Sequence, residues 1–147
     1  AFEETAHLIM YGKLPNQGEL DGLSAKLKAS RDIPAEVIDN IRITTGQGAN
    51  SMAVLRSAVS LLSAFDHEYN PNDTPLETMF DTGIRISSQI ATIVAAYHRI
   101  KRGLEPVAPD KDYSHAENFL YMVHGKKPTA EDAALMNRDF ILHILQF

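Results

Sequence analysis

Residues that begin and end α-helices occur at intervals along the whole chain. At a helix start, a side-chain oxygen of the N-cap residue accepts a hydrogen bond from the backbone. A glutamate three residues later often accepts a hydrogen bond from the N-cap backbone in return, and Asn16 and Glu19 have this spacing. At a helix end, a glycine in the left-handed conformation is common, and Gly12 and Gly125 are placed for that role. Between these signals, apolar residues recur every three or four positions. The sequence therefore predicts an all-α, multi-helical protein.

The same signals predict where the helices lie. Ser114 and Thr129 are further N-cap residues, and Thr74 and Pro75 begin the longest apolar pattern of the chain. Pro34 is placed at the first position of a helix, and the loop at 70–73 is expected to be an exposed, mobile turn. We expect helices at about 2–11, 16–30, 34–45, 51–64, 74–102, 114–124 and 129–147.

Length and composition limit what kind of protein this is. A chain of 147 residues is sufficient for one domain with a real core, so we predict a single helical domain over 1–147. The net charge of −5 argues against a nucleic-acid partner. No apolar run reaches the roughly 18 residues of a membrane span, and the lack of cysteine suits a reducing compartment, so we expect a cytoplasmic protein. Because the chain begins at Ala1 rather than at a methionine, we expect its true N-terminus to lie upstream.

Local motifs for metal or nucleotide binding are weak. None of the six histidines forms a His-x-x-x-His pair on one helical face, so we predict no metal site. The segment Gly46-Gln-Gly-Ala-Asn-Ser51 approximates a dinucleotide-binding loop, but a serine replaces the third glycine and no parallel partner strand follows. We interpret it as a loop between helices, with Asn50 or Ser51 as the next N-cap. By its spacing alone, His143 would be a partly buried histidine near the chain end.

Several longer segments, in this order and spacing, carry a family resemblance. They are Phe2-Glu-Glu, Tyr11-Gly-Lys-Leu-Pro15, the helix Met52 to Ser60, Ile84 to Tyr97, and the stretch from Arg99 to Gly125 with its Glu-Pro-Val-x-Pro crossing. Together the segments resemble the citrate synthase family over nearly the whole chain. The resemblance implies an all-helical fragment from the N-terminal part of that family's large domain.

The resemblance also implies a reaction and a binding residue. The family condenses acetyl-CoA with oxaloacetate and water to give citrate and CoA, without a further cofactor. Its catalytic aspartate and histidines would lie beyond Phe147, so we place no catalytic residue in this chain and expect it to be inactive alone. His143 matches the first histidine of the family's His-x-x-His-Glu motif and is the one expected substrate-binding residue, while Gln146 and Phe147 replace the other two.

The resemblance further implies that the chain pairs with itself. The helices near 52–64 and 75–101 would form the interface of a homodimer. Small residues along the second helix, Ser87, Ser88, Ala91, Ala95 and Ala96, would allow close helix approach. Two alternatives stay open: a non-catalytic helical dimerisation module of the same family, and a fragment of a 2-methylcitrate synthase.

Overall fold

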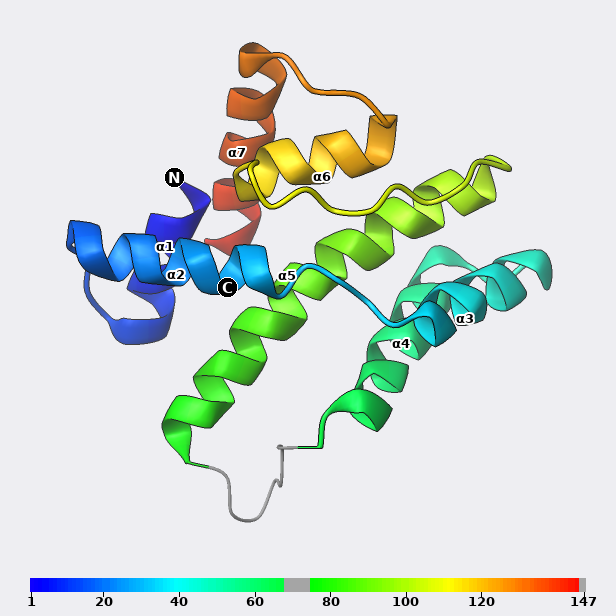
Figure 1. Cartoon of the computed structure of the whole chain (residues 1–147), viewed down its shortest axis with the longest axis horizontal. Helices are drawn as coiled ribbons and strands as arrows, with labels where there is room; N and C mark the ends of the chain where they lie inside the picture. Colours follow the sequence, from blue (N-terminus) through cyan, green and yellow to red (C-terminus); the bar gives the residue numbers. More distant parts are fainter. Residues whose placement is uncertain (68–74, 146–147) are drawn as a thin grey trace.

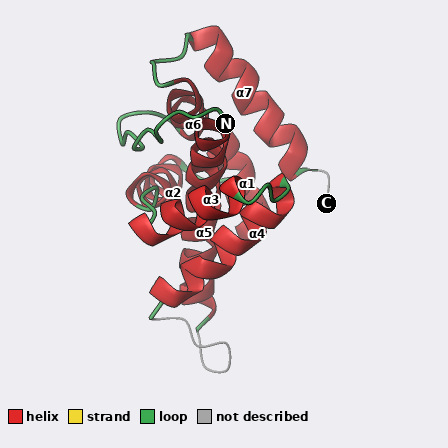
Figure 2. Ribbon diagram, turned by 90° about the vertical axis from the view of Figure 1, so that its right-hand side faces the viewer, coloured by secondary structure: helices red, strands yellow, loops and turns green. Residues whose placement is uncertain are grey.

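The computed structural model describes residues 1–67 and 75–145, and within these ranges the regular structure is helical with no strand (Figure 2). This confirms the predicted all-α class. In the described residues, no helix is both long and apolar enough to cross a membrane. The helices are α1 (Phe2–Tyr11), α2 (Gln17–Ala29), α3 (Ala35–Gly46), α4 (Ser51–Leu62), α5 (Leu76–Lys101), α6 (His115–His124) and α7 (Ala130–Ile144), with a 3-10 turn η1 (Ser63–Phe65) after α4.

The helix ends follow the local signals closely. Asn16 Oδ1 accepts from the backbone N–H of Glu19 at 2.9 Å, and the Glu19 carboxylate accepts from the backbone N–H of Asn16 at 2.9 Å. The side chain of Ser114 caps α6 and that of Thr129 caps α7. Gly125 ends α6 with φ 72°, a left-handed conformation that favours glycine. These caps confirm the predicted starts and stops.

Two boundaries differ from the prediction. Pro34 is the N-cap of α3 rather than its first helical residue, because its ψ of 148° is extended. Helix α3 ends at Gly46, close to the predicted end, and Asn50, one of the two predicted caps, begins α4. Helix α4 ends at Leu62, where the tighter turn η1 takes over. Thr74 and the predicted turn at 70–73 lie outside the described residues.

Helix α5 is the central element of the fold. It contacts α2, α3, α4 and α6, and Figure 1 shows it running diagonally through the molecule between them. Its small residues make these contacts possible, since Ala95 is 1% and Ala96 is 4% exposed. Ser88 and Ala91 are also buried. Four of the five small residues expected at a dimer interface therefore serve packing within the chain, and only Ser87 is exposed.

Two hydrophobic clusters form on either side of α5. The larger joins α3 and α4 to the second half of α5 and includes Ile41, Val54 and Ile93, each fully buried. The smaller joins α2 to the first half of α5 through Leu23, Leu27 and Ile84. Both follow from apolar residues at helical spacing.

The N-terminal helix holds the C-terminal helix in place. The backbone N–H of Phe2 donates to Asn137 Oδ1 at 2.9 Å, and the ring of Phe2 lies 5.8 Å from that of Phe140. Phe2 also stacks on His115 of α6 at 4.5 Å. Residues at opposite ends of the chain therefore fix where α7 lies.

Candidate functional site

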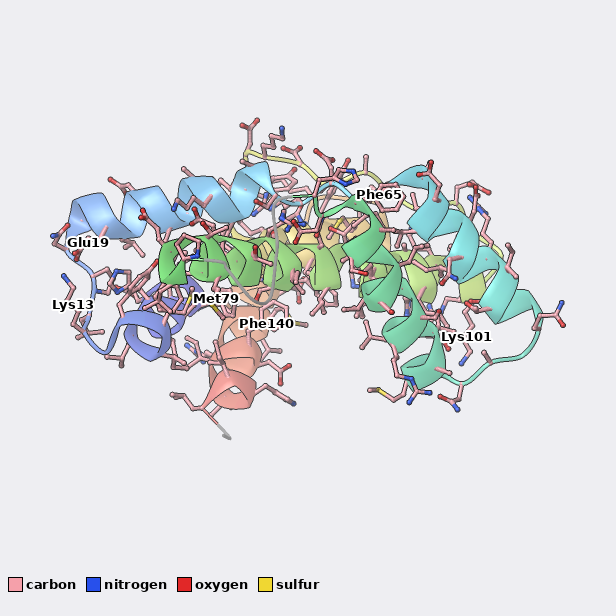
Figure 3. All side chains as sticks on the ribbon, turned by 90° about the horizontal axis from the view of Figure 1, so that it is seen from below. Lys13, Glu19, Phe65, Met79, Lys101 and Phe140 are labelled. Carbon is pink, nitrogen blue, oxygen red and sulfur yellow. The ribbon has the colours of Figure 1, made fainter. Side chains whose placement is uncertain are left out.

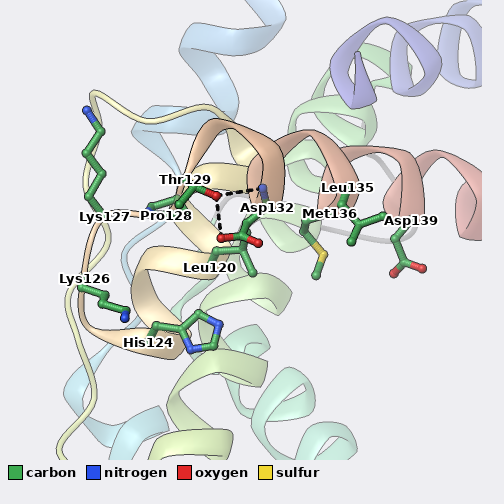
Figure 4. A pocket seen from close by; sticks show the side chains of 10 residues that line it. All are labelled: Leu120, His124, Lys126, Lys127, Pro128, Thr129, Asp132, Leu135, Met136 and Asp139. Atoms are coloured by element: carbon green, nitrogen blue, oxygen red, sulfur yellow. Dashed lines mark hydrogen bonds between the residues drawn. The ribbon is translucent and has the colours of Figure 1, made fainter.

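A cleft of about 760 Å³ lies between α6 and α7 (Figure 4). It forms because the left-handed turn at Gly125 sends the chain back across α6. The positive φ of 72° favours glycine at position 125, and a Cβ there would lie 3.1 Å from Arg99 Nη1, which would have to shift by a few tenths of an ångström. The cleft is lined by Leu120, His124, Lys126, Lys127, Pro128, Thr129, Asp132, Leu135, Met136 and Asp139.

Side chains of opposite charge line this cleft. Lys126 and Lys127 follow the end of α6, whereas Asp132 and Asp139 lie on α7 (Figure 4). Asp132 is committed to the helix cap, because its carboxylate accepts from Thr129 Oγ1 at 2.7 Å. Asp139 is the carboxylate that remains for a ligand. The cleft offers binding groups above an apolar floor, which suits recognition of a small molecule.

His143 lies one turn beyond Asp139, at the end of α7 and outside the lining of the cleft. Its Nδ1 is 3.0 Å from the carbonyl oxygen of Asp139 and 3.7 Å from the Asp139 carboxylate. The side chain is 68% exposed, so the partial burial expected from spacing alone is wrong. Gln146 and Phe147 lie outside the described residues. The substrate-binding role of His143 stays a prediction.

Basic residues in the last turn of α5, among them Arg99 and Lys101, make contacts within the fold. Arg99 Nε donates to the carbonyl of Glu105 at 2.5 Å, and its Nη1 donates to the carbonyl of Val123 at 3.3 Å. Lys101 lies over the ring of Tyr97. The contacts of Arg99 join the end of α5 to the segment that follows it and to α6.

The other candidate motifs are not assembled into sites. Among the described residues, no three histidine, aspartate or glutamate side chains gather as metal ligands. The segment before the glycine-rich loop is helix α3 rather than a strand, which removes the structural context of a dinucleotide-binding loop. His115 is instead a packing residue, 5% exposed, and burial lowers its pKa to about 4.

Comparison with known proteins identifies the family. The family model described as citrate synthase, C-terminal domain, matches residues 1–144. The chain belongs to the citrate synthase family. This confirms the resemblance seen in the sequence.

Individual relatives agree with this assignment. The chain is 36% identical to citrate synthase 2 of Bacillus subtilis over 143 residues and 37% identical to the citrate synthase of Haloferax volcanii over 144 residues. Each match covers 97% of the chain and 38% of the relative. The chain therefore spans somewhat more than a third of the length of these relatives.

Solved citrate synthase structures contain the same fold. The chain matches the citrate synthase of Thermoplasma acidophilum, in a ternary complex with carboxymethyl coenzyme A and oxaloacetate, with a TM-score of 0.87 and 27% identity. It matches the citrate synthase of Pyrobaculum aerophilum with a TM-score of 0.83 and 29% identity. These matches cover 97% of this chain and 36% and 37% of the respective structures.

Proposed function

We propose that this chain works as part of a citrate synthase that condenses acetyl-CoA with oxaloacetate and water to give citrate and CoA. The observation that carries the proposal is the fold match, with a TM-score of 0.87 over 97% of the chain, to a citrate synthase in complex with oxaloacetate and a CoA analogue. In this proposal the chain contributes part of the helical framework of the enzyme. The reaction uses the two substrates and water and needs no cofactor.

His143 is the residue proposed to contact substrate. It ends α7, its ring is held by the backbone of Asp139, and its side chain is free to meet a ligand. No residue of this chain is proposed as a catalytic acid or base. Enolisation of acetyl-CoA needs a base and a group that stabilises the enolate together, and one histidine cannot supply both.

The 2-methylcitrate alternative has weaker support. The Bacillus subtilis relative named citrate/2-methylcitrate synthase is 25% identical over 143 residues, whereas citrate synthase 2 of the same organism is 36% identical over 143 residues. Citrate is therefore the favoured product.

A homodimer, a cytoplasmic location and a role in the tricarboxylic acid cycle belong to the same proposal. Support for the homodimer comes from half-buried apolar residues on α4 and α5, such as Leu55, Ile90 and Val94, which a second copy would cover. Cell fractionation tests the location directly.

The activity test compares the 147-residue chain with the complete reading frame that encodes it. Thiol release from acetyl-CoA that depends on oxaloacetate is expected only from the complete protein. Propionyl-CoA in place of acetyl-CoA distinguishes the 2-methylcitrate alternative. A complete protein that dimerises without activity would favour the non-catalytic module. If the 147-residue chain alone released thiol from acetyl-CoA in the presence of oxaloacetate, and His143→Ala abolished that release, the proposal that the chain is inactive alone would be wrong.

A further inference from the structure

Helix α7 lies at an edge of the fold and packs mainly on two other helices. Figure 2 shows it along one side of the molecule, and its contacts are made mainly with α1 and α6. Within Ala130–Ile144, no side chain is buried. The helix nevertheless carries His143 and one wall of the cleft between α6 and α7. The contacts that hold α7 against α1 and α6 therefore also maintain that cleft.

A cluster of rings holds α7 in place, and His115 of α6 is one of them. The imidazole stacks on the ring of Phe2 of α1 with a centroid distance of 4.5 Å, and it lies 5.4 Å from the ring of Phe140 of α7. Phe140 also lies 5.8 Å from Phe2 and 5.5 Å from Phe119 of α6. Three helices thus meet at one buried histidine, which is 5% exposed.

The surroundings of this imidazole disfavour its protonated form. Its Nδ1 is buried and has no hydrogen-bond partner among the described residues, so an imidazolium would have an N–H there without an acceptor. Two charged groups act on the ring: Glu3 of α1 favours the protonated form, and Arg31, between α2 and α3, opposes it. Helix α7 faces the ring with Phe140, which carries no charge. Burial outweighs the effect of Glu3 and lowers the pKa of His115 to about 4.

Separation of α7 would relieve this penalty with a small loss of packing. Removing Phe140 exposes one side of the imidazole to water, which can solvate the charge. Helix α1 stays attached without α7, because Ala6 and Met10 pack on the smaller hydrophobic cluster. The buried members of the larger cluster all lie on α3, α4 and α5. Release of α7 is therefore the opening that exposes His115 with the least loss of buried apolar surface.

We propose that His115 and the rings around it form an acid-sensitive latch: when the imidazole takes up a proton, α7 separates from α1 and α6 while the other helices stay packed. The released form is a minor state whose population grows as the pH falls. Release removes one wall of the cleft between α6 and α7 and displaces His143. The proposal rests on contacts within this chain and is independent of the proposed citrate synthase activity.

Amide hydrogen exchange of the 147-residue chain at pH 7 and pH 4.5, followed by NMR, tests the latch. Dividing each exchange rate by that of an unstructured amide at the same pH gives the equilibrium constant for opening. With an ordinary pKa of 6.5 in the released form and about 4 in the closed form, this constant should rise by up to about 60-fold for α7. Because the opening is local, exchange in α7 should depend less on added urea than exchange in α3 and α4.

Two variants distinguish His115 from other titrating groups. His115→Phe keeps a ring that can stack on Phe2 but cannot take up a proton, so the rise in the opening constant of α7 should largely disappear. His67→Phe makes the same change at an exposed histidine after η1 and should leave the rise intact. If His115→Phe does not fold, NMR titration of the His115 ring in the parent chain takes its place, and a ring pKa near 6.5 would contradict the latch.

Two results of the exchange experiment would overturn the proposal. Equal urea dependence in α7, α3 and α4 would show that these helices open together rather than α7 alone. A rise in the opening constant of α7 that persists in His115→Phe would show that another group triggers the release. The urea comparison needs only the parent chain, so it does not depend on the folding of any variant.

Discussion

Arg31 shows how one buried side chain organises distant segments. It is 1% exposed, and its guanidinium donates to the backbone carbonyls of Asp110 and Tyr113, the latter at 2.8 Å. Burial lowers the pKa of Arg31, and Glu3, Asp110 and Glu117 offset part of that effect. The side chain thereby ties the connection between α2 and α3 to the segment that leads into α6.

Replacing Arg31 with methionine should therefore destabilise the fold. The change keeps much of the volume but leaves two partly buried carbonyls without these donors, so we expect a loss of about 2–4 kcal/mol in the free energy of unfolding. Urea denaturation measures this. The matched control is Arg42→Met, at an exposed ion pair with Glu105, where little change is expected. Equal losses in the two variants would show that Arg31 has no special role.

His115 predicts how stability depends on pH. Burial lowers its pKa from 6.5 to about 4, with Arg31 acting in the same direction and Glu3 opposing. Between pH 6.5 and about pH 4, the imidazole of His115 is protonated more fully in the unfolded chain than in the folded chain. Stability should consequently fall as the pH drops from about 6.5 towards 4, by about 3 kcal/mol from this residue.

The variant His115→Phe isolates that contribution. Phenylalanine keeps the stack with Phe2, in which the rings lie 4.5 Å apart, but has no titrating group. Urea denaturation at several pH values should show a shallower decline for the variant between pH 6.5 and 4 than for the parent chain. Carboxylates with lowered pKa, such as Glu117, affect both proteins alike. Parallel curves would contradict the assignment.

Sequence reasoning succeeded for residues whose role is local. Asn16, Ser114 and Thr129 act on backbone groups within three residues, so their neighbours in sequence reveal their function. It failed for the exposure of His143, which depends on how α7 packs. No signal near His115 could reveal its burial either, because Phe2 and Phe140, which enclose it, lie far away in the sequence.

At the scale of elements, α5 acts as a spine through polar as well as apolar contacts. Ser88 Oγ donates to the carbonyl of Leu27 at 2.6 Å, and Thr92 Oγ1 donates to the carbonyl of Arg31 at 2.7 Å. With Gln89, these side chains satisfy backbone carbonyls where α2 ends and the chain crosses to α3. The buried polar side chains of α5 thus donate hydrogen bonds to carbonyls that have no backbone donor in this irregular connection.

Thr92→Val tests this role of α5. Valine has nearly the same shape but cannot donate, so the carbonyl of Arg31 loses this donor and we expect destabilisation by about 1–3 kcal/mol. Thr5→Val, at a threonine of α1 whose hydrogen bond is long and exposed, should change stability by less than about 0.5 kcal/mol. Thermal and urea unfolding of the two variants provide the comparison. A neutral Thr92→Val would mean that water replaces the hydroxyl.

The same helix shows what a sequence pattern leaves undecided. The small residues of α5 predict close approach by other helices, but they do not say whether the partner helix belongs to the same chain or to another. Ala95 and Ala96 are buried against this chain's own helices, so a substitution there would test folding rather than association. Residues of α5 that a second copy could still reach include Gly83, Ser87, Ile90 and Val94.

At the scale of the whole molecule, the apolar surface is unevenly covered. Figure 3 shows α4 and α7 extending to the same side of α5. Met79, on α5, is 47% exposed. Met52 on α4 is 67% exposed. Exposed large apolar residues on a small domain favour association, because covering them with another molecule removes apolar surface from water.

Self-association of the 147-residue chain is therefore expected, with Ile90 near the centre of the contact. Ile90→Arg places a charge on a half-buried apolar face, where pairing with a second copy would have to desolvate it, and should shift the chain to a monomer. Ile43→Arg makes the same change on α3, at a side chain that is 65% exposed, and should leave the dimer intact. Sedimentation velocity distinguishes these states, and circular dichroism checks that both variants keep their helices. A parent chain that stays monomeric at high micromolar concentration would exclude self-association. A dimer that Ile43→Arg disrupts as strongly as Ile90→Arg would place the contact elsewhere.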